Sequence, residues 1–332
     1  MNPRINDRLA VMLGAWLFGS MAGCALDGTT GEEDEESAPA SWENGVDGPI
    51  LVELNARAGE RFELDGRNIL APPPGTSLFS ETLYETGESR ILHLRSETDG
   101  RVFLVESAPH LHDEDGDVVQ GQSAAGETSN PDAPAPCSTT AYATLGFRWK
   151  KTLKWKFNDS TTPSGLSKTD VAAKLKRAAS NITGSKNSCN LADEVSATHR
   201  YLGTTTAKAQ IDGNGDCTGD DGANVVSFGT LPSGTHAKAC YNYTNDGAAI
   251  SADMKLNKAS YTWTTTPGSS SCSNRWSIEA VATHEWGHAF GLGHVSESSH
   301  GNQTMSPSIN GSCQNSEATL GAGDVAGLRD LY

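Results

Sequence analysis

Residues 284–294 decide the interpretation of this chain, and they read His284-Glu285-Trp286-Gly287-His288-Ala289-Phe290-Gly291-Leu292-Gly293-His294. If the first part of this stretch is helical, positions four apart lie on one face. His284 and His288 can then point at one metal ion, with Glu285 displaced around the helix toward a bound water. Gly291 can take the positive φ that ends a helix, and the turn would bring His294 back as a third ligand.

Three neutral imidazoles and one water form the open tetrahedral zinc site of catalytic centres, whereas structural zinc sites are usually closed by four protein ligands. Zinc lowers the pKa of its water to about 7, and Glu285 would take the proton as the resulting hydroxide attacks a peptide carbonyl. Glu285 would then pass that proton to the leaving amine. The pattern therefore predicts a peptidase with one catalytic Zn²⁺. The alternative is a surface-displayed binding or adhesion protein with a non-catalytic metal site, which would have no use for Glu285.

The same eleven residues match the extended motif His-Glu-x-x-His-x-x-Gly-x-x-His of the metzincin clan at every fixed position. Metzincins carry a methionine in a tight turn beneath the metal, and Met305 follows His294 within Gln303-Thr304-Met305-Ser306-Pro307-Ser308. A lone methionine is more often a core residue, so its place after the third histidine is what identifies Met305 as the turn methionine.

Within that clan the chain resembles the matrixins, in a small bacterial form. Residues 248–257 with Trp263 resemble the family's last sheet strand, and residues 323–332 resemble its closing helix. The resemblance covers roughly residues 140–332. It implies an α+β, zincin-like catalytic domain with a twisted mixed β-sheet, two long helices and an irregular C-terminal subdomain. It also implies that the strand around 239–241 is a sheet edge at the active site, whose unpaired backbone groups can bind an extended protein or peptide substrate.

Some positions depart from the family's pattern. Val295 stands where many matrixins have serine, and Ser306 stands where animal members commonly have tyrosine. The details of the substrate pocket therefore cannot be carried over. The Pro-Arg-Cys-Gly type of propeptide switch is not found either, since Cys137 lies near the expected boundary without its flanking residues.

The amino terminus predicts export. Arg4 and Arg8 precede an apolar stretch, 9–18, that is too short to span a bilayer permanently, and Ala22-Gly23 then precede Cys24. This is the pattern of a bacterial lipoprotein signal peptide over residues 1–23, with Cys24 as the lipidated first residue. An ordinary secretory signal is the alternative. We expect a lipid-anchored protein of the bacterial cell envelope, with release into the medium after processing left open.

The remaining cysteines agree with export. They form an even set confined to the predicted catalytic region, and no Cys-x-x-Cys pair suggests a zinc cluster. Six cysteines allow fifteen pairings, among which the sequence does not choose; Cys217 with Cys240 and Cys272 with Cys313 are the local options. The set is Cys137, Cys189, Cys217, Cys240, Cys272 and Cys313.

Charge divides the chain. Residues 27–136 hold 24 acidic against 6 basic side chains, and residues 137–332 hold 16 against 17, so the net charge of −16 comes from the front half. Residues 24–45, which include Glu32-Glu33-Asp34-Glu35-Glu36, are polar and predict a disordered tether. No basic patch or phosphate-binding loop points to nucleic acid or nucleotide.

Alternating apolar residues at 50–54, 61–64, 91–94 and 102–105 predict a small β-rich module over residues 46–129. It is either an inhibitory prosegment or a permanent accessory domain. Residues 130–136 are a Pro-rich linker and a candidate processing site, and residues 137–332 are the predicted peptidase domain.

Within the peptidase domain, residues 147–149 and 153–157 predict a first strand, and residues 167–179 have the cap and apolar spacing of a first helix. Residues 225–228 and 237–243 predict further strands. The loop 212–222 is rich in Asp and Gly, so Ca²⁺ is a possible ligand there, although Cys217 and Ala223 break the EF-hand pattern. The other histidines lack ligand spacing. Oligomeric state and substrate identity are not predicted.

Overall fold

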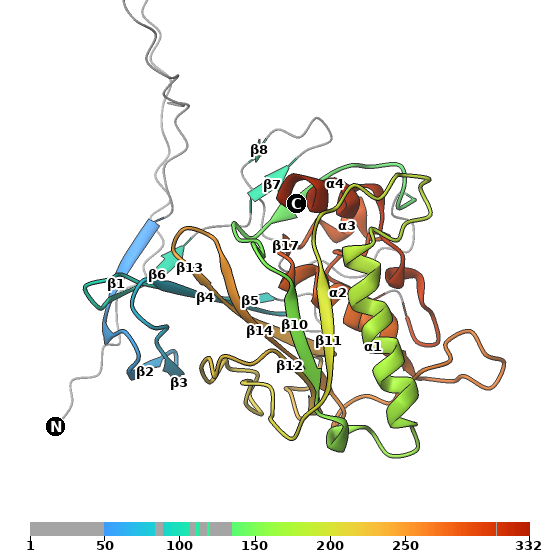
Figure 1. Cartoon of the computed structure of the whole chain (residues 1–332), viewed down its shortest axis with the longest axis horizontal. Helices are drawn as coiled ribbons and strands as arrows, with labels where there is room; N and C mark the ends of the chain where they lie inside the picture. The colour runs from blue at the N-terminus through green and yellow to red at the C-terminus, as the bar shows by residue number, and fades with distance from the viewer. Residues whose placement is uncertain (1–49, 84–88, 107–109, 113–117, 120–134, 310) are drawn as a thin grey trace, which may run out of the picture. The chain divides into compact units, whose positions relative to one another are not determined.

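The computed structural model describes residues 50–83, 89–106, 110–112, 118–119, 135–309 and 311–332 (Figure 1). The predicted signal peptide with Cys24, the predicted acidic tether and most of the predicted Pro-rich linker lie outside the described residues. Within the described ranges, no helix has the length and apolar character needed to cross a membrane.

Among the described elements, strands β1 to β10 precede the first α-helix, and strands β11 to β16 separate α1 from α2. The strands are β1 (Ile50–Arg57), β2 (Arg61–Leu64), β3 (Arg67–Leu70), β4 (Thr76–Leu83), β5 (Ser89–Ser96), β6 (Arg101–Glu106), β7 (His110–His112), β8 (Val118–Val119), β9 (Tyr142–Thr144), β10 (Leu153–Phe157), β11 (His199–Thr204), β12 (Val225–Gly229), β13 (Ala237–Thr244), β14 (Ala249–Asn257), β15 (Trp263–Thr264), β16 (Trp276–Ser277) and β17 (Leu292–Gly293). The helices are α1 (Lys168–Thr183), α2 (Ile278–Ala289), α3 (Glu297–His300) and α4 (Ala322–Leu331), with single 3₁₀ turns at Asp159–Thr161 and Ser316–Ala318.

Among these residues, the main sheet is mixed and has the order β1-β6-β5-β4-β13-β14-β12-β10-β11. The strands β14, β12, β10 and β11 run parallel to one another, whereas β13 and the four strands beyond it pair antiparallel. The expected α+β architecture with a mixed sheet is therefore confirmed. The sheet also continues past β13 into the amino-terminal module, which the sequence did not predict.

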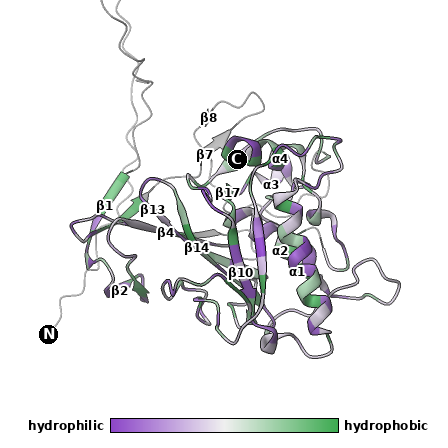
Figure 2. Ribbon diagram, viewed as in Figure 1, coloured by the Kyte–Doolittle hydropathy of each residue, from purple (hydrophilic) through white to green (hydrophobic). Residues whose placement is uncertain are grey.

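Apolar spacing explains the elements that form the core. In β10, Leu153, Trp155 and Phe157 are buried while the lysines between them are exposed. Ser167 caps the start of helix α1, and its hydroxyl accepts the backbone N–H of Asp170. The alternation of hydrophobic and hydrophilic residues along these elements can be followed in Figure 2. The expected first helix is confirmed and runs four residues further than predicted.

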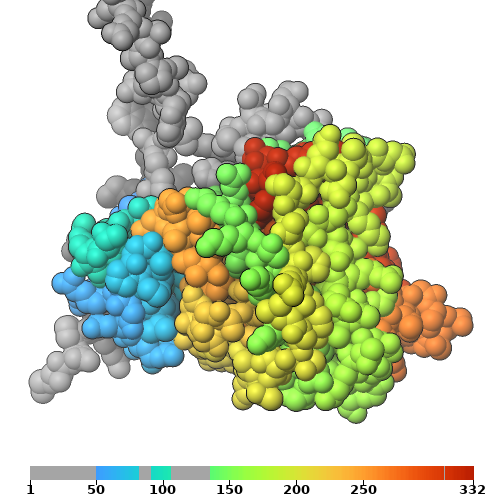
Figure 3. Space-filling model, in the orientation of Figure 1, coloured from blue at the N-terminus to red at the C-terminus, as the bar shows by residue number. Residues whose placement is uncertain are grey.

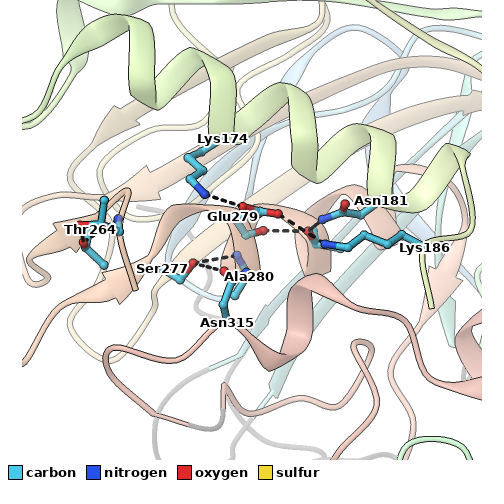
Figure 4. Close-up of polar contacts among 10 residues, drawn as sticks. Lys174, Asn181, Lys186, Thr264, Ser277, Glu279, Ala280 and Asn315 are labelled. Carbon is cyan, nitrogen blue, oxygen red and sulfur yellow. Dashed lines mark hydrogen bonds and ion pairs between the residues drawn. The ribbon is translucent and has the colours of Figure 1, made fainter. Parts of the chain in front are cut away.

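Helix α2 is buried along its whole length, and polar anchors fix its first turn (Figure 4). The Ser277 hydroxyl accepts the N–H of Ala280 and caps the helix. The Glu279 carboxylate is 2 % exposed and lies 2.8 Å from Lys174 Nζ of α1 and 3.7 Å from Lys186 Nζ. Because both cations come from α1 or the residues after it, this carboxylate ties α2 to α1.

Some expectations about individual elements were wrong. Residues 147–149 do not join the first strand and contribute only an isolated bridge between Arg148 and Ala248. Strand β11 was not predicted, because only one of its faces is partly buried and its apolar content is low. The closing helix is present as α4.

The disulfides join Cys217 to Cys240, Cys272 to Cys313 and Cys137 to Cys189.

Candidate metal centre

Three histidines from helix α2 and the turn after it converge on one point. His284, His288 and His294 are each less than 9 % exposed, and their Nε2 atoms lie 3.0 Å from one another. Among the described residues, they form the one group of three or more potential ligands with the proximity that a metal ion requires. The spacing of four residues on a helix thus places the first two rings together, as the sequence predicted.

The opposite ring nitrogens of His284 and His288 donate to backbone carbonyls, and that of His294 faces a carboxylate. His284 Nδ1 donates to the Thr304 carbonyl at 2.7 Å, and His288 Nδ1 donates to the Leu292 carbonyl at 2.9 Å. His294 Nδ1 lies 3.1 Å from Glu81 Oε1. A carbonyl or carboxylate accepts only from a protonated nitrogen, so these contacts leave the Nε2 lone pairs facing inward.

This arrangement fits a cation. Three lone pairs about 3 Å apart repel one another, and a single proton could bridge only one of the three pairs. A divalent ion bound by all three imidazoles satisfies every lone pair together, and outer carbonyl or carboxylate partners are the usual means of orienting such ligands.

Two glycines of the motif shape this centre. Gly291 has a φ of 96°, as expected for the turn that returns His294, and an added Cβ would lie 2.2 Å from the Phe147 carbonyl oxygen. At Gly287, an added Cβ would lie 2.2 Å from Met305 Sδ. The helix that carries two of the histidines therefore rests directly on Met305, which is 1 % exposed.

A buried carboxylate holds the turn around Met305. Asp324 at the start of α4 accepts the backbone N–H groups of Thr304, Met305 and Gly321 at 2.7–3.1 Å. Burial raises the pKa of Asp324 to about 6, against the lowering effect of these N–H groups. Because the Thr304 carbonyl accepts from His284, Asp324 supports the orientation of one imidazole through the backbone.

Glu285 and Glu81 give the centre its charge. Burial raises the pKa of Glu285 to about 8, in part against the attraction of His294 and Lys238. Burial would also raise the pKa of Glu81, but the neighbouring His294, His288 and Lys238 hold it below its usual value. The pKa of His294 is correspondingly raised by Glu81, although burial opposes this.

Comparison with known families identifies the larger part of the chain. The family model described as Matrixin matches residues 148–332, which include β10, α1, β13, all three histidines and Met305. The chain belongs to the matrixin family. Matrixins are zinc metalloendopeptidases, so this protein is a zinc metalloendopeptidase that uses catalytic zinc and acts on peptide bonds. No curated protein matches this matrixin.

The structure also shows what the other candidate residues of this matrixin do. Cys137 is bonded to Cys189, so it is not free to reach the histidines. In the loop 212–222, Asp212 accepts the N–H groups of Asn214 and Asp216, and Asp216 pairs with Arg67 at 3.1 Å. Nothing in that loop supports the calcium site that its composition suggested, and its carboxylates brace the backbone instead.

Two residues at the centre were not singled out from the sequence. Glu81 comes from β4, about two hundred positions before the histidines, and no local spacing marks it. Asp324 could have been suspected from its place in the closing segment that resembles matrixins, but its contact with the Met305 turn required the structure.

Proposed function

We propose that His284, His288 and His294 hold the catalytic zinc and that Glu285 is the general base of peptide-bond hydrolysis. The convergence of three inward-facing Nε2 atoms beside a buried carboxylate supports this assignment more than any other observation. A structural zinc site would need a fourth protein ligand and would gain nothing from Glu285.

When bound, the zinc ion supplies an activated hydroxide and polarises the peptide carbonyl. Glu285 then has two tasks, which are to accept the proton released as the carbonyl is attacked and to deliver it to the leaving amine. A raised pKa, here about 8, suits a group that must hold a proton between these two events, and a nearby cation would bring that pKa down toward neutrality.

The proposed substrate is an extended stretch of polypeptide that pairs with strand β13. Backbone pairing along a strand depends little on side chains, so it favours unfolded or flexible protein as substrate. Burial raises the pKa of the Tyr241 hydroxyl on β13, and the charges of Glu81 and Glu285 raise this pKa further, which supports the proposal that substrate binds along this strand.

We further propose that the protein is exported and anchored by lipid at Cys24, which would hold the enzyme at the bacterial cell envelope. Support for this comes from the Arg4 to Cys24 sequence pattern and from three disulfides, which persist in oxidising compartments. The intact mass of the mature protein should equal residues 24–332 plus a lipid and minus six hydrogens; a mass that begins elsewhere would contradict the anchor.

The mechanism is tested with the full chain carrying a protease recognition sequence within residues 124–130, assayed on casein and a quenched peptide before and after the cut. Glu285→Ala should retain one zinc per chain and lose hydrolysis by several orders of magnitude in the cut form. Glu194→Ala, at an exposed position, is the matched control and should keep both. Equal hydrolysis by Glu285→Ala and the control would reject Glu285 as the base.

A further inference from the structure

The turn between the second and third histidines is held by its backbone carbonyls. Residues 289–292 lead from the end of α2 into β17, and each of their four carbonyls accepts a hydrogen bond. His288 Nδ1 is the donor to the Leu292 carbonyl, and the other three donors come from distant parts of the chain. The last carbonyls of a helix have no partner within the helix and need donors from elsewhere. The position of His294 therefore depends on groups outside the turn.

Two aromatic side chains supply donors to the first two of these carbonyls. Trp149 Nε1 donates to the Ala289 carbonyl at 2.7 Å, and the Tyr332 hydroxyl donates to the Phe290 carbonyl at 3.0 Å. The same hydroxyl accepts the backbone N–H of Trp149 at 2.9 Å. Burial raises the pKa of Tyr332, so its hydroxyl keeps the proton that it donates. Trp149 and Tyr332 thus form one hydrogen-bonded unit that ends on the turn.

The segment before β10 runs alongside this turn. Strand β9 pairs antiparallel with β17, and the Leu145 N–H donates to the Gly291 carbonyl at 2.8 Å. The Tyr332 ring meets the Phe290 ring edge-on, with centroids 6.0 Å apart. In Figure 3 the dark red surface of α4 lies beside the green residues that precede β10. Residues 147–149, which do not form the expected strand, are therefore placed where they can hold the end of α2.

Holding the turn matters most before a metal ion binds. The three Nε2 lone pairs face one another at 3.0 Å and repel, and His294 is the one ligand whose backbone lies outside α2. This repulsion favours an open turn, whereas the donors from Trp149 and Tyr332 favour the closed one. When only a fraction of the molecules has the binding geometry, the apparent Kd rises by the inverse of that fraction. An interaction that keeps His294 in place without the ion therefore tightens zinc binding.

We propose that Trp149 and Tyr332 are positioning residues of the zinc site, which hold the turn 289–292 so that His294 is in place before the ion binds. This inference rests on the proposed function, because it concerns the same three ligands. Neither side chain is itself a ligand. Each acts through a backbone carbonyl of the turn, that of Ala289 for the indole and that of Phe290 for the hydroxyl.

The inference is tested in the full chain by removing one donor at a time. Trp149→Phe removes the indole N–H and Tyr332→Phe removes the hydroxyl, while both keep an aromatic ring. Trp263→Phe is the matched control, because Trp263 Nε1 donates to the Asn257 carbonyl at 2.9 Å, at the end of β14. It removes the same kind of donor from a carbonyl that does not belong to the turn.

Zinc affinity from chelator competition separates positioning from general stability. Each single variant should bind zinc about 3- to 10-fold more weakly than wild type, and the variant with both changes at least about 10-fold more weakly. Trp263→Phe should keep the wild-type affinity, although its Tm without metal should fall by a few degrees, as in Trp149→Phe. An affinity of the double variant within about twofold of wild type would overturn the inference, and so would an equal loss in the control.

A second readout requires neither zinc nor hydrolysis. Hydrogen exchange of the amides at 290–294 in the metal-free chain should be about 10-fold faster in the double variant than in wild type, because the turn opens more often, and unchanged in Trp263→Phe. Equal exchange in wild type and the double variant would overturn the holding of the turn. A wild type that binds no zinc would overturn the proposed function and this inference with it, whereas equal zinc binding by wild type and all variants would overturn this inference alone.

Discussion

Replacing Gly291 by alanine should destabilise the turn that leads to His294 through two separable effects. The residue has a φ of 96°, and a Cβ built there lies 2.2 Å from the Phe147 carbonyl oxygen and 3.2 Å from Leu331 Cδ1. Holding an L-residue in the left-handed region costs about 1–2 kcal/mol. Relieving the contact with Phe147 requires a backbone shift, and overpacking of this kind costs about 1–3 kcal/mol. Together we expect a loss of about 2–5 kcal/mol.

Gly203 is a matched control for the first effect. Its φ is 98°, and a Cβ there would meet nothing within 4 Å. Gly203→Ala should therefore show the backbone cost alone, about 1–2 kcal/mol. The difference between the two variants measures the contact with Phe147.

The assay is urea unfolding of the full chain at saturating zinc, followed by tryptophan fluorescence, with the midpoint and slope compared among wild type and the two variants. Zinc affinity from chelator competition should fall in Gly291→Ala and stay at the wild-type value in Gly203→Ala. The reason is that Gly291 lies three residues before His294, and its carbonyl accepts the backbone N–H of Leu145. Equal losses of stability in the two variants would refute the packing argument.

Three further substitutions test buried carboxylates of the fold. Burial raises the pKa of Asp253 to about 7. The folded chain therefore binds this proton more tightly than the unfolded chain does, and the folded state loses stability as the pH rises from about 4 to 7. Asp253→Asn should raise the Tm more at pH 8 than at pH 5; the same gain at both would contradict this account. Asp324→Asn places an amide against backbone N–H donors, so zinc binding should weaken about 10-fold or more in chelator competition. Unchanged zinc affinity would show that Asp324 does not help to orient His284. Glu279→Gln should cost about 1–3 kcal/mol in urea unfolding, whereas Asp246→Asn, at an exposed ion pair, should leave the unfolding midpoint unchanged. Equal shifts in the two variants would argue against the anchoring of α2.

Local patterns were sufficient to predict the metal centre and most of the catalytic sheet. The four-residue spacing of His284 and His288 and the glycine at position 291 act within one helix and one turn, so sequence neighbours determine their geometry. Strand β10 and helix α1 likewise carry apolar periodicities that match their buried faces.

Contacts between distant segments could not be predicted in this way. The segment 76–83 has no strict alternation, because both faces of β4 are buried at residues 77–80, where Ser77 and Ser80 are buried together with the apolar residues between them. Its pairing with β13 joins residues more than 160 positions apart. Glu81 is an ordinary glutamate in the sequence, and only this pairing carries it to His294. The composition of the Asp-rich loop does not distinguish cation binding from the role seen in the structure, in which short carboxylates accept backbone N–H groups.

The zinc content of the purified full chain tests the central claim most directly. Metal analysis after dialysis should give one zinc per chain for the wild type and for His199→Ala, and close to none for His288→Ala at the same concentration. Full zinc occupancy in His288→Ala, or more than one tightly bound zinc in the wild type, would contradict a single catalytic ion held by the three imidazoles.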